Sequence, residues 1–430
     1  MNMMVRKSLI LIIGFCLFLP YFVFAQGKSS KKHEINWSIN LSKGQDSARI
    51  TMFNLGLLSN ISEQRGTSFN LFYSAVHRQM YGFQFSGVLG YAGNVAGVQL
   101  GTFANIVKND VSGVMLSGLL NAVGGDSNGV QLAGITNITG KRFDGLMLAG
   151  LMNVSAEEMN GVQLSSLINT SGDRLNGVQL SLLGNVGSDV VGVQSSVISN
   201  IAASRVKGVQ LAGVANIAFN VDKALQFSSL TNVCLDDMDG IQLALGNYAE
   251  NVDGAQIGLV NISTGKVRGW QFGIVNHSKD TTARKIGLVN VTPRTKIQAM
   301  IFGSNTSKIN LAIRFKNKMN YSILGIGTHY ADMNNNFSGS VFYRTGLYFP
   351  LKRRFEISGD LGYYHIENFE DADIDIPERL YSVQARVNLS YKILPKLSIF
   401  ASTGYAMTRH YKKNKSFSNK GIIEGGIILF

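Results

Sequence analysis

Proline and cysteine are both scarce in this chain of 430 residues, which holds only five prolines and two cysteines. Proline cannot donate a hydrogen bond to a β-ladder, so its scarcity leaves room for long uninterrupted ladders. Cys16 lies in an apolar N-terminal run, and Cys234 is the one cysteine in the rest of the chain. A disulfide framework is therefore excluded, and we interpret Cys234 as a small core residue rather than a nucleophile.

Long apolar runs are missing after residue 25, so we expect no later helix to span a bilayer. The first 25 residues themselves have the form of a signal peptide, with Arg6 and Lys7 before an apolar run and Val23, Phe24 and Ala25 as the cleavage site. Export then removes two positive charges and lowers the formal net charge from +13 to +11. The sequence predicts a bacterial protein of the outer membrane or cell surface.

Recognisable catalytic motifs are also missing. The six histidines are dispersed, no Ser/His/Asp arrangement is evident, and the glycines do not open helices as in nucleotide-binding loops. Basic residues are scattered among acidic ones, which argues against nucleic acid as a partner. We therefore predict no enzyme and no cofactor. The one weak candidate for a metal site is an acidic loop with Asp371, Asp373 and Asp375, whose oxygens suit calcium.

Glycine is abundant, with 47 residues, and it marks an internal repeat in the middle of the chain. The clearest copies are Gly129–Asn137, Gly161–Asn169, Gly177–Asn185 and Gly208–Asn216, each close to Gly-Val-Gln-Leu-Ala-Gly-Ile-Thr-Asn. The leading glycine and the closing asparagine recur mostly every 15 or 16 residues, and charged residues lie only between copies. Frequent glycine and the lack of a 3.6-residue apolar period indicate a strand followed by a turn.

Two architectures fit this repeat. In a β-solenoid each copy forms one coil, and equivalent residues stack at about 4.8 Å. In a membrane barrel each copy forms one antiparallel strand with its turn. The uniform period favours the solenoid, because barrel turns alternate between short and long. The absence of charge from the first ten positions, including the variable eighth position, favours the barrel, because a water-facing strand normally carries Lys or Glu. We favour the solenoid.

Amide side chains occupy two fixed positions of the repeat. If the copies stack, these columns become hydrogen-bonded ladders; if they face solvent, they offer regularly spaced groups to a polymer such as a glycan. The ladder is the preferred interpretation. The candidate residues are Gln131, Gln163, Gln179, Gln210, Asn137, Asn153, Asn169, Asn185 and Asn216.

The C-terminal part alternates in a different way. Tyr381, Val383, Ala385, Val387, Leu389, Tyr391 and Ile393 alternate with Ser382, Gln384, Arg386, Asn388, Ser390 and Lys392, which predicts a strand with one apolar and one polar face. Similar segments recur from about residue 297, with aromatic residues near their ends. We predict an outer-membrane-type antiparallel barrel of about eight strands.

Its connections also alternate, since Pro350–Arg354 and Pro395–Lys396 are short and basic whereas Glu367–Arg379 and Arg409–Asn419 are long. We place the short set in the periplasm and the long set outside. Phe430, a terminal aromatic after an apolar strand, resembles the signal that outer-membrane barrels present to their insertion machinery. The predicted organisation is thus all-β: signal peptide 1–25, N-terminal segment 26–49, repeat domain 50–296 and barrel 297–430.

The repeat resembles the surface-repeat family of Bacteroidetes and spirochaete envelope proteins. The segments Phe355–Leu361 and Lys396–Ser402 are similar to those that follow such repeats in some Bacteroidetes members. The resemblance implies an envelope location and transfers no activity. We expect a non-enzymatic surface protein with a structural or binding role, whose partners are membrane lipid and the insertion machinery, with glycans, lipopolysaccharide or another envelope protein as further candidates. The alternative is a porin-like transport protein in which the repeats extend one large barrel.

Overall fold

The computed structural model describes residues 35–40, 50–328, 338–351, 354–368, 379–411 and 416–430. The predicted signal peptide lies outside these residues, as does most of the segment 26–49. Within the described ranges the chain is all-β, and no helix capable of crossing a bilayer is found there. The chain forms two compact units, residues 1–255 and 256–430.

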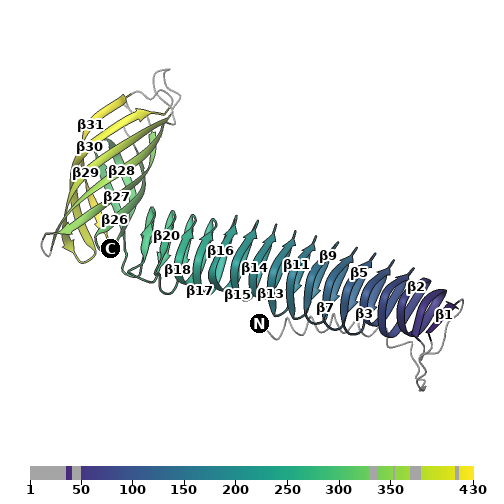
Figure 1. The fold of residues 1–430 in the computed structure, drawn as a ribbon. Coiled ribbons are helices and arrows are strands. Elements are labelled where there is room, and N and C mark those ends of the chain that lie inside the picture. The colour runs from purple at the N-terminus through teal and green to yellow at the C-terminus, as the bar shows by residue number, and fades with distance from the viewer. Residues whose placement is uncertain (1–34, 41–49, 329–337, 352–353, 369–378, 412–415) are drawn as a thin grey trace. The chain divides into compact units, whose positions relative to one another are not determined.

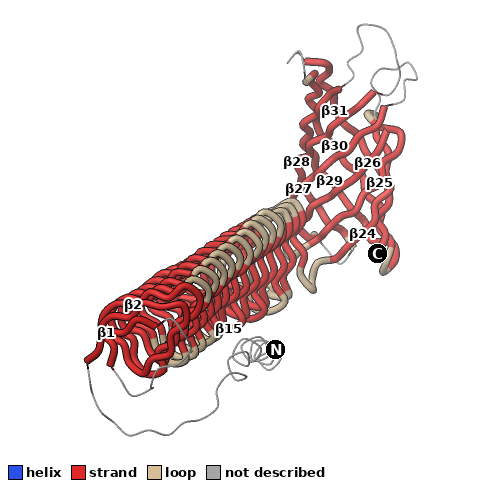
Figure 2. Tube along the Cα trace, turned by 90° about the vertical axis from the view of Figure 1, so that its right-hand side faces the viewer, coloured by secondary structure: helices blue, strands red, loops and turns tan. Residues whose placement is uncertain are grey.

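Parallel strands that stack turn upon turn form the repeat region, a β-solenoid of about 14 turns (Figure 1). Equivalent residues pair between successive turns, as when Gly161 lies beside Gly145 on one side and Gly177 on the other. Figure 2 shows that the loops of successive turns lie in line along the stack. The solenoid prediction is confirmed, and the alternative of antiparallel barrel strands is wrong, because the repeat strands pair in parallel.

The strands of the solenoid have these bounds: β1 (Ile35–Asn40), β2 (Ile50–Ser86), β3 (Leu89–Gly101), β4 (Ala104–Val107), β5 (Val111–Ser117), β6 (Leu120–Val123), β7 (Ser127–Ala133), β8 (Thr136–Thr139), β9 (Phe143–Ala149), β10 (Met152–Ser155), β11 (Glu158–Ser165), β12 (Ile168–Ser171), β13 (Arg174–Ser181), β14 (Gly184–Ser196), β15 (Ser199–Ala212), β16 (Ala215–Ser228), β17 (Thr231–Leu243), β18 (Gly246–Ile257), β19 (Val260–Ser263), β20 (Trp270–Phe272), β21 (Val275–Ser278), β22 (Arg284–Ile286) and β23 (Val289–Val291).

The leading glycine of each turn is required by its backbone. Gly161 has a φ of 126°, and a Cβ there would lie 2.1 Å from the carbonyl oxygen of Gly145. Only glycine adopts this conformation without strain. The column has one exception in the first unit, Ala224, and there the positive φ moves to the preceding residue, Lys223, at 48°.

The solenoid has an apolar column inside, formed by the residue two places before the leading glycine. Its members are almost completely buried, and Ser127 interrupts the column between Val111 and Phe143. They are Met80, Val95, Val111, Phe143, Met159, Leu175, Val190, Val206, Met238 and Val252.

Eight antiparallel strands form the barrel, and β24 pairs with β31 to close it. The barrel strands are β24 (Lys296–Ser304), β25 (Ser307–Lys316), β26 (Asn320–Thr328), β27 (Ser338–Pro350), β28 (Phe355–Asn368), β29 (Arg379–Leu394), β30 (Leu397–His410) and β31 (Ser416–Leu429). This confirms the predicted fold class. The connections at one end are short, at residues 317–319, 351–354 and 395–396, and those at the other end include the longer segments 329–337 and 369–378.

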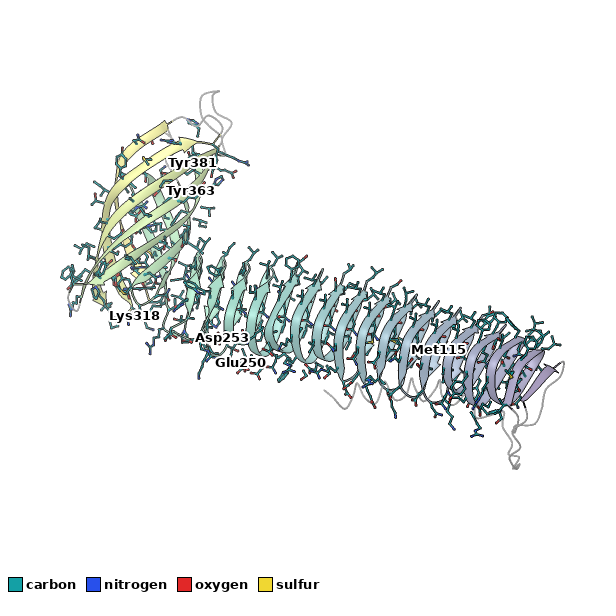
Figure 3. All side chains as sticks on the ribbon, viewed as in Figure 1. Met115, Glu250, Asp253, Lys318, Tyr363 and Tyr381 are labelled. Carbon is teal, nitrogen blue, oxygen red and sulfur yellow. The ribbon has the colours of Figure 1, made fainter. Side chains whose placement is uncertain are left out.

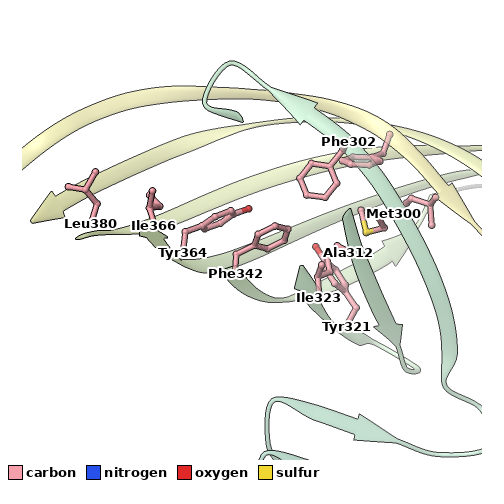
Figure 4. Close-up of a cluster of buried hydrophobic side chains, with 11 residues drawn as sticks. Met300, Phe302, Ala312, Tyr321, Ile323, Phe342, Tyr364, Ile366 and Leu380 are labelled. Atoms are coloured by element: carbon pink, nitrogen blue, oxygen red, sulfur yellow. The ribbon is translucent and has the colours of Figure 1, made fainter. Parts of the chain in front are cut away.

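Apolar side chains fill part of the barrel interior (Figure 4). Phe342 stacks on Tyr364 with ring centroids 4.6 Å apart and meets Phe302 edge-on at 5.8 Å. Gly325 makes room for this layer, because a Cβ there would lie 2.2 Å from the ring of Phe342. The barrel thus has a packed core rather than an open lumen.

Candidate functional site

The predicted asparagine column forms a continuous ladder in the solenoid interior. Asn169 donates through Nδ2 to Oδ1 of Asn185 at 3.0 Å and to the carbonyl oxygen of Leu180 at 2.7 Å, and it accepts from Asn153 at 3.0 Å. The same pattern links Asn137 to its neighbours, and Asn216 likewise. All five predicted asparagines are completely buried. Their amides therefore hydrogen-bond to one another and to the backbone instead of facing solvent.

The glutamine column forms a second ladder over part of the stack. Gln179 donates to Gln163 at 2.7 Å, and the chain of Nε2 to Oε1 bonds continues through Gln194 and Gln210 at 2.8 Å. These side chains have no exposed surface. Each amide both donates and accepts, so the members of a column of identical residues can hydrogen-bond to one another.

Gln131 does not belong to this ladder. Its neighbours in the column are Met115 and Met147, so it donates to the hydroxyls of Ser127 at 2.9 Å and Thr139 at 3.2 Å. Its own Oε1 is buried and accepts no hydrogen bond. The column is therefore interrupted on both sides of this residue.

The outer surface of the solenoid carries a continuous apolar row, which sequence reasoning did not place. The row is formed by the residue two places before the asparagine column, in which Ser74 and Gly90 replace asparagine in the first two turns, and its side chains are between 37% and 52% exposed. In the first unit its members are Phe72, Val88, Phe103, Leu119, Ile135, Leu151, Leu167, Leu183, Ile198, Val214, Leu230 and Leu245. The missing charge at the first ten repeat positions was the signal for this surface. We assigned that signal to barrel strands, although it belongs to the outside of a solenoid.

A second apolar row runs beside the first, three residues after the leading glycine of the turn. Here too the side chains are exposed or half-buried. Its members include Phe85, Leu100, Leu116, Leu132, Leu148, Leu164, Leu180, Leu211 and Phe227. An open groove of about 360 Å³ follows this row over five turns, from Phe85 to Leu148, and Thr102 and Gly134 also line it.

Charged side chains of the solenoid are confined to one edge. Between residues 79 and 254, each charged residue lies in one part of its turn. This part begins three residues after the asparagine and ends before the next leading glycine. This charged edge carries seven basic and thirteen acidic residues, a net charge of −6. Glu250 and Asp253 project from it in Figure 3. On it, Asp189 lies between Arg174 at 3.7 Å and Arg205 at 3.1 Å.

An ionic network occupies the barrel interior. Arg344 donates from Nε and Nη2 to the two carboxylate oxygens of Asp360, both at 2.9 Å, and from Nη1 to Glu424 at 2.8 Å. Tyr321 and Asn388 each donate to Asp360 at 2.8 Å. Arg386 lies 3.9 Å from Asp360 and 3.4 Å from Glu424, and all four charged side chains are at most 2% exposed, so two positive and two negative charges balance one another in the interior.

The space left beside this network is small. A cavity of about 10 Å³ lies among Tyr321, Arg344 and Asn388, about the volume that a single water requires. Together with the apolar layer around Phe342, the network fills the barrel where these side chains meet.

The remaining residues singled out from the sequence belong neither to the amide ladders nor to the ionic network. Phe430 follows β31, is 68% exposed and donates its backbone N–H to Lys396 at 2.8 Å. Cys234 is buried in the solenoid, and burial raises the pKa of its thiol to about 11, which keeps it protonated. Asp371, Asp373 and Asp375 lie outside the described residues, and within the described ranges no three potential ligands gather around a metal site.

No protein-family model and no curated protein matches this chain. The similarity to the surface-repeat family is therefore one of motif, without a family match to support it. Two solved structures are similar to part of the chain. A de novo designed transmembrane β-barrel is 11% identical, with a TM-score of 0.23, and the match covers 32% of this chain and 95% of the designed one. Neisserial surface protein A is 9% identical, with a TM-score of 0.22, and the match covers 31% of this chain and 93% of that protein.

Proposed function

We propose that the chain is a non-enzymatic outer-membrane protein whose barrel spans the membrane as a closed anchor. One observation carries the proposal: the barrel strands expose apolar side chains on the outside and bury polar and charged side chains inside. In β29, Val387 and Leu389 are 54% and 48% exposed, whereas their neighbours Arg386 and Asn388 are 4% and 5% exposed. A soluble barrel has the reverse arrangement, and a barrel in lipid needs this one.

Aromatic side chains near both ends of the barrel support the same proposal. At the short-turn end Phe355 and Tyr391 pack with centroids 4.8 Å apart. At the other end Tyr381 lies 6.4 Å from Tyr363 and 5.1 Å from Tyr411. Such groups match the two interfaces of a membrane, where amphipathic rings are favoured. In this arrangement the short basic turns face the periplasm, as the sequence suggests.

A closed anchor is favoured over a pore. The large-barrel alternative is wrong, because the repeats form a separate solenoid. The Arg344 network and the layer around Phe342 occupy the interior of the eight-stranded barrel, and the space among Tyr321, Arg344 and Asn388 is only about 10 Å³, which supports a closed barrel. The solenoid then has a structural or binding role, with glycans, lipopolysaccharide or another envelope protein as candidate partners.

Lysine substitution on the outer wall tests the membrane assignment. Leu361 and Ile423 are 63% and 71% exposed, each within the central part of its strand. Leu361→Lys or Ile423→Lys should each cost about 2–4 kcal/mol of barrel stability in a bilayer. The matched control is Met319→Lys, because Met319 is 57% exposed but lies in a short turn. The effect is measured as the fraction of protein that folds into lipid vesicles. Folded barrel is recognised on gels by its different migration before and after heating.

Equal folding of all three variants would contradict a lipid-facing wall. The anchor role has its own test, because the filled interior predicts no ion conductance by the full chain in planar bilayers. Steady channels there would contradict the closed barrel while leaving the membrane assignment intact.

A further inference from the structure

We propose that the solenoid lies flat on a membrane, with its two apolar rows against the acyl chains of one leaflet and its charged edge in water. The proposal concerns the unit of residues 1–255 by itself. It goes beyond a barrel anchor, because it assigns a lipid ligand to the repeat region. Four features of the solenoid support it.

The first feature is the separation of charge. All charged residues between 79 and 254 lie on the charged edge, and neither apolar row contains one. The first row continues over twelve successive turns, and a long contiguous apolar stripe of this kind marks an interaction surface. An amphipathic rod of this kind has the distribution that places one side in hydrocarbon and the other in water.

The second feature is the shape of the apolar surface. The first row lies on the short segment that joins consecutive strands of a turn, and the second row lies on the strand just before it, so together they cover a corner and one side of it. Ile135 belongs to one row and Leu132 to the other, with Gly134 between them. A second rigid solenoid would cover one side of this corner. Fluid acyl chains adapt to both the corner and its side, and for that reason we favour lipid over a second copy of the chain.

The third feature is the backbone beneath the first row. The N–H of Leu119 donates to the carbonyl oxygen of Phe103 at 2.9 Å, and Ile135 and Leu151 continue the series at 3.0 and 2.9 Å. Hydrocarbon accepts a protein surface only if its backbone groups are already bonded within the protein. Stacked turns meet this condition along the row.

The fourth feature is length. Twelve row members in parallel register extend over about 50 Å at about 4.8 Å per turn. A hydrocarbon core is about 30 Å thick, so the row is too long to cross it upright. The solenoid must therefore lie along the membrane plane. The open groove from Phe85 to Leu148 spans five successive turns along the stack, which suits a linear acyl chain.

Site-specific fluorescence on the full chain tests the proposal. Cys234→Ser removes the buried thiol. Serine is tolerated at this repeat position, because Ser155 and Ser171 occupy it in other turns. A polarity-sensitive dye is then attached through Leu151→Cys on the apolar row or Glu157→Cys on the charged edge of the same turn. The vesicles contain phosphatidylcholine, with or without spin-labelled lipid as a quencher.

The dye at position 151 should shift to the blue and be quenched by the spin-labelled lipid, while the dye at 157 should respond only to aqueous iodide. Contact through apolar groups should persist at high salt, since screening weakens only charge attraction. Equal access of iodide to both dyes would overturn the proposal. Energy transfer between labelled copies, without lipid quenching at 151, would also overturn it and assign the surface to a second copy.

A third label, at Leu361→Cys on the barrel wall, separates the two proposals. Quenching by lipid at 361 but not at 151 would leave the membrane anchor standing and remove the lipid contact of the solenoid. The opposite result would remove the anchor and keep the solenoid contact.

Discussion

The solenoid and the barrel both bury polar groups beside apolar ones and expose apolar groups outside, yet they bury different polar groups. The solenoid interior holds neutral amides, such as Asn169 and Gln179, in repeated columns. The barrel interior holds charges, with Arg344 between Asp360 and Glu424. Strand direction explains this difference.

In parallel stacking each residue meets its own kind at about 4.8 Å, so a buried column of charges would repel itself. An amide avoids this repulsion because it both donates and accepts. In the antiparallel barrel, inward residues from different strands meet unlike residues, and opposite charges can pair. Between residues 79 and 254 the solenoid carries its charges only on the charged edge, where Asp189 lies between Arg174 and Arg205.

The largest effect should follow from removing the central barrel charge. Arg344→Met leaves the buried carboxylates of Asp360 and Glu424 with only Arg386 as a counter-charge, at 3.9 and 3.4 Å, which should cost about 3–5 kcal/mol. Urea unfolding of the barrel in lipid measures the loss. The control is Arg379→Met, because Arg379 is 66% exposed in its pair with Glu367 and such pairs contribute at most about 1 kcal/mol. Similar losses for both variants would show that the network is not essential.

Placing one charge in the amide ladder should have the next largest effect. Asn169→Asp has nearly the same shape but no donor for Asn185 or for the carbonyl oxygen of Leu180. We expect a loss of at least about 3 kcal/mol at neutral pH, since an unpaired buried charge costs more than a neutral group. Hydrogen exchange of the flanking turns measures it. Asn128→Asp, at an exposed position, should change little; an equally mild effect at 169 would break the contrast between the two interiors.

The glycine column is specific to the solenoid. Gly161→Ala introduces a Cβ 2.1 Å from the carbonyl oxygen of Gly145 at a φ of 126°, which should cost about 1–3 kcal/mol. Gly246→Ala is the control, because the nearest atom to its Cβ would be 3.6 Å away. Thermal unfolding monitored by circular dichroism should separate the two variants. If they unfold alike, backbone strain at the column is unimportant.

One substitution should stabilise the solenoid. Met147→Gln would place an amide donor beside the unpaired Oε1 of Gln131 and extend the ladder that begins at Gln163. A gain of about 1 kcal/mol is expected for the new hydrogen bond. Met147→Leu controls for the loss of the sulfur. Local hydrogen exchange in strands β7 to β11 is the measurement, and no gain over the leucine variant would contradict the ladder's contribution.

The sequence predicted local features better than spatial ones. Alternation from Tyr381 to Ile393 predicted the two faces of β29, and the 16-residue period predicted the asparagine ladder, because both depend on neighbours fixed by register. The ionic network could not be predicted, since Arg344 and Glu424 are 80 residues apart and meet only when the barrel closes. The sequence also did not predict which side chains of the repeat face outward. The apolar Leu132 and the polar Gln131 are neighbours, and either could have been the buried one.

The end of the glutamine column offers the smallest effect and a pH dependence. Lys285 pairs in register with Gln271 and donates to the carbonyl oxygen of Val291 at 2.9 Å. Burial lowers the pKa of Lys285 from its usual 10.5 to about 8. The unfolded chain then binds more protons than the folded chain between about pH 8 and 10, so stability should rise with pH across that window.

The variant Lys285→Gln removes this titration and puts a glutamine at the last position of the glutamine column. Hydrogen exchange of residues 271 to 286, compared between pH 8 and 10 after correction for the intrinsic exchange rate, should show a rise in the wild type and none in the variant. The variant should also be the more stable of the two at neutral pH, because there the wild type still holds a partly buried charge at the end of a neutral column. A rise that survives the substitution would mean that another group titrates. In that case another charged group would titrate inside the solenoid, which would contradict the contrast between its neutral amides and the charges inside the barrel.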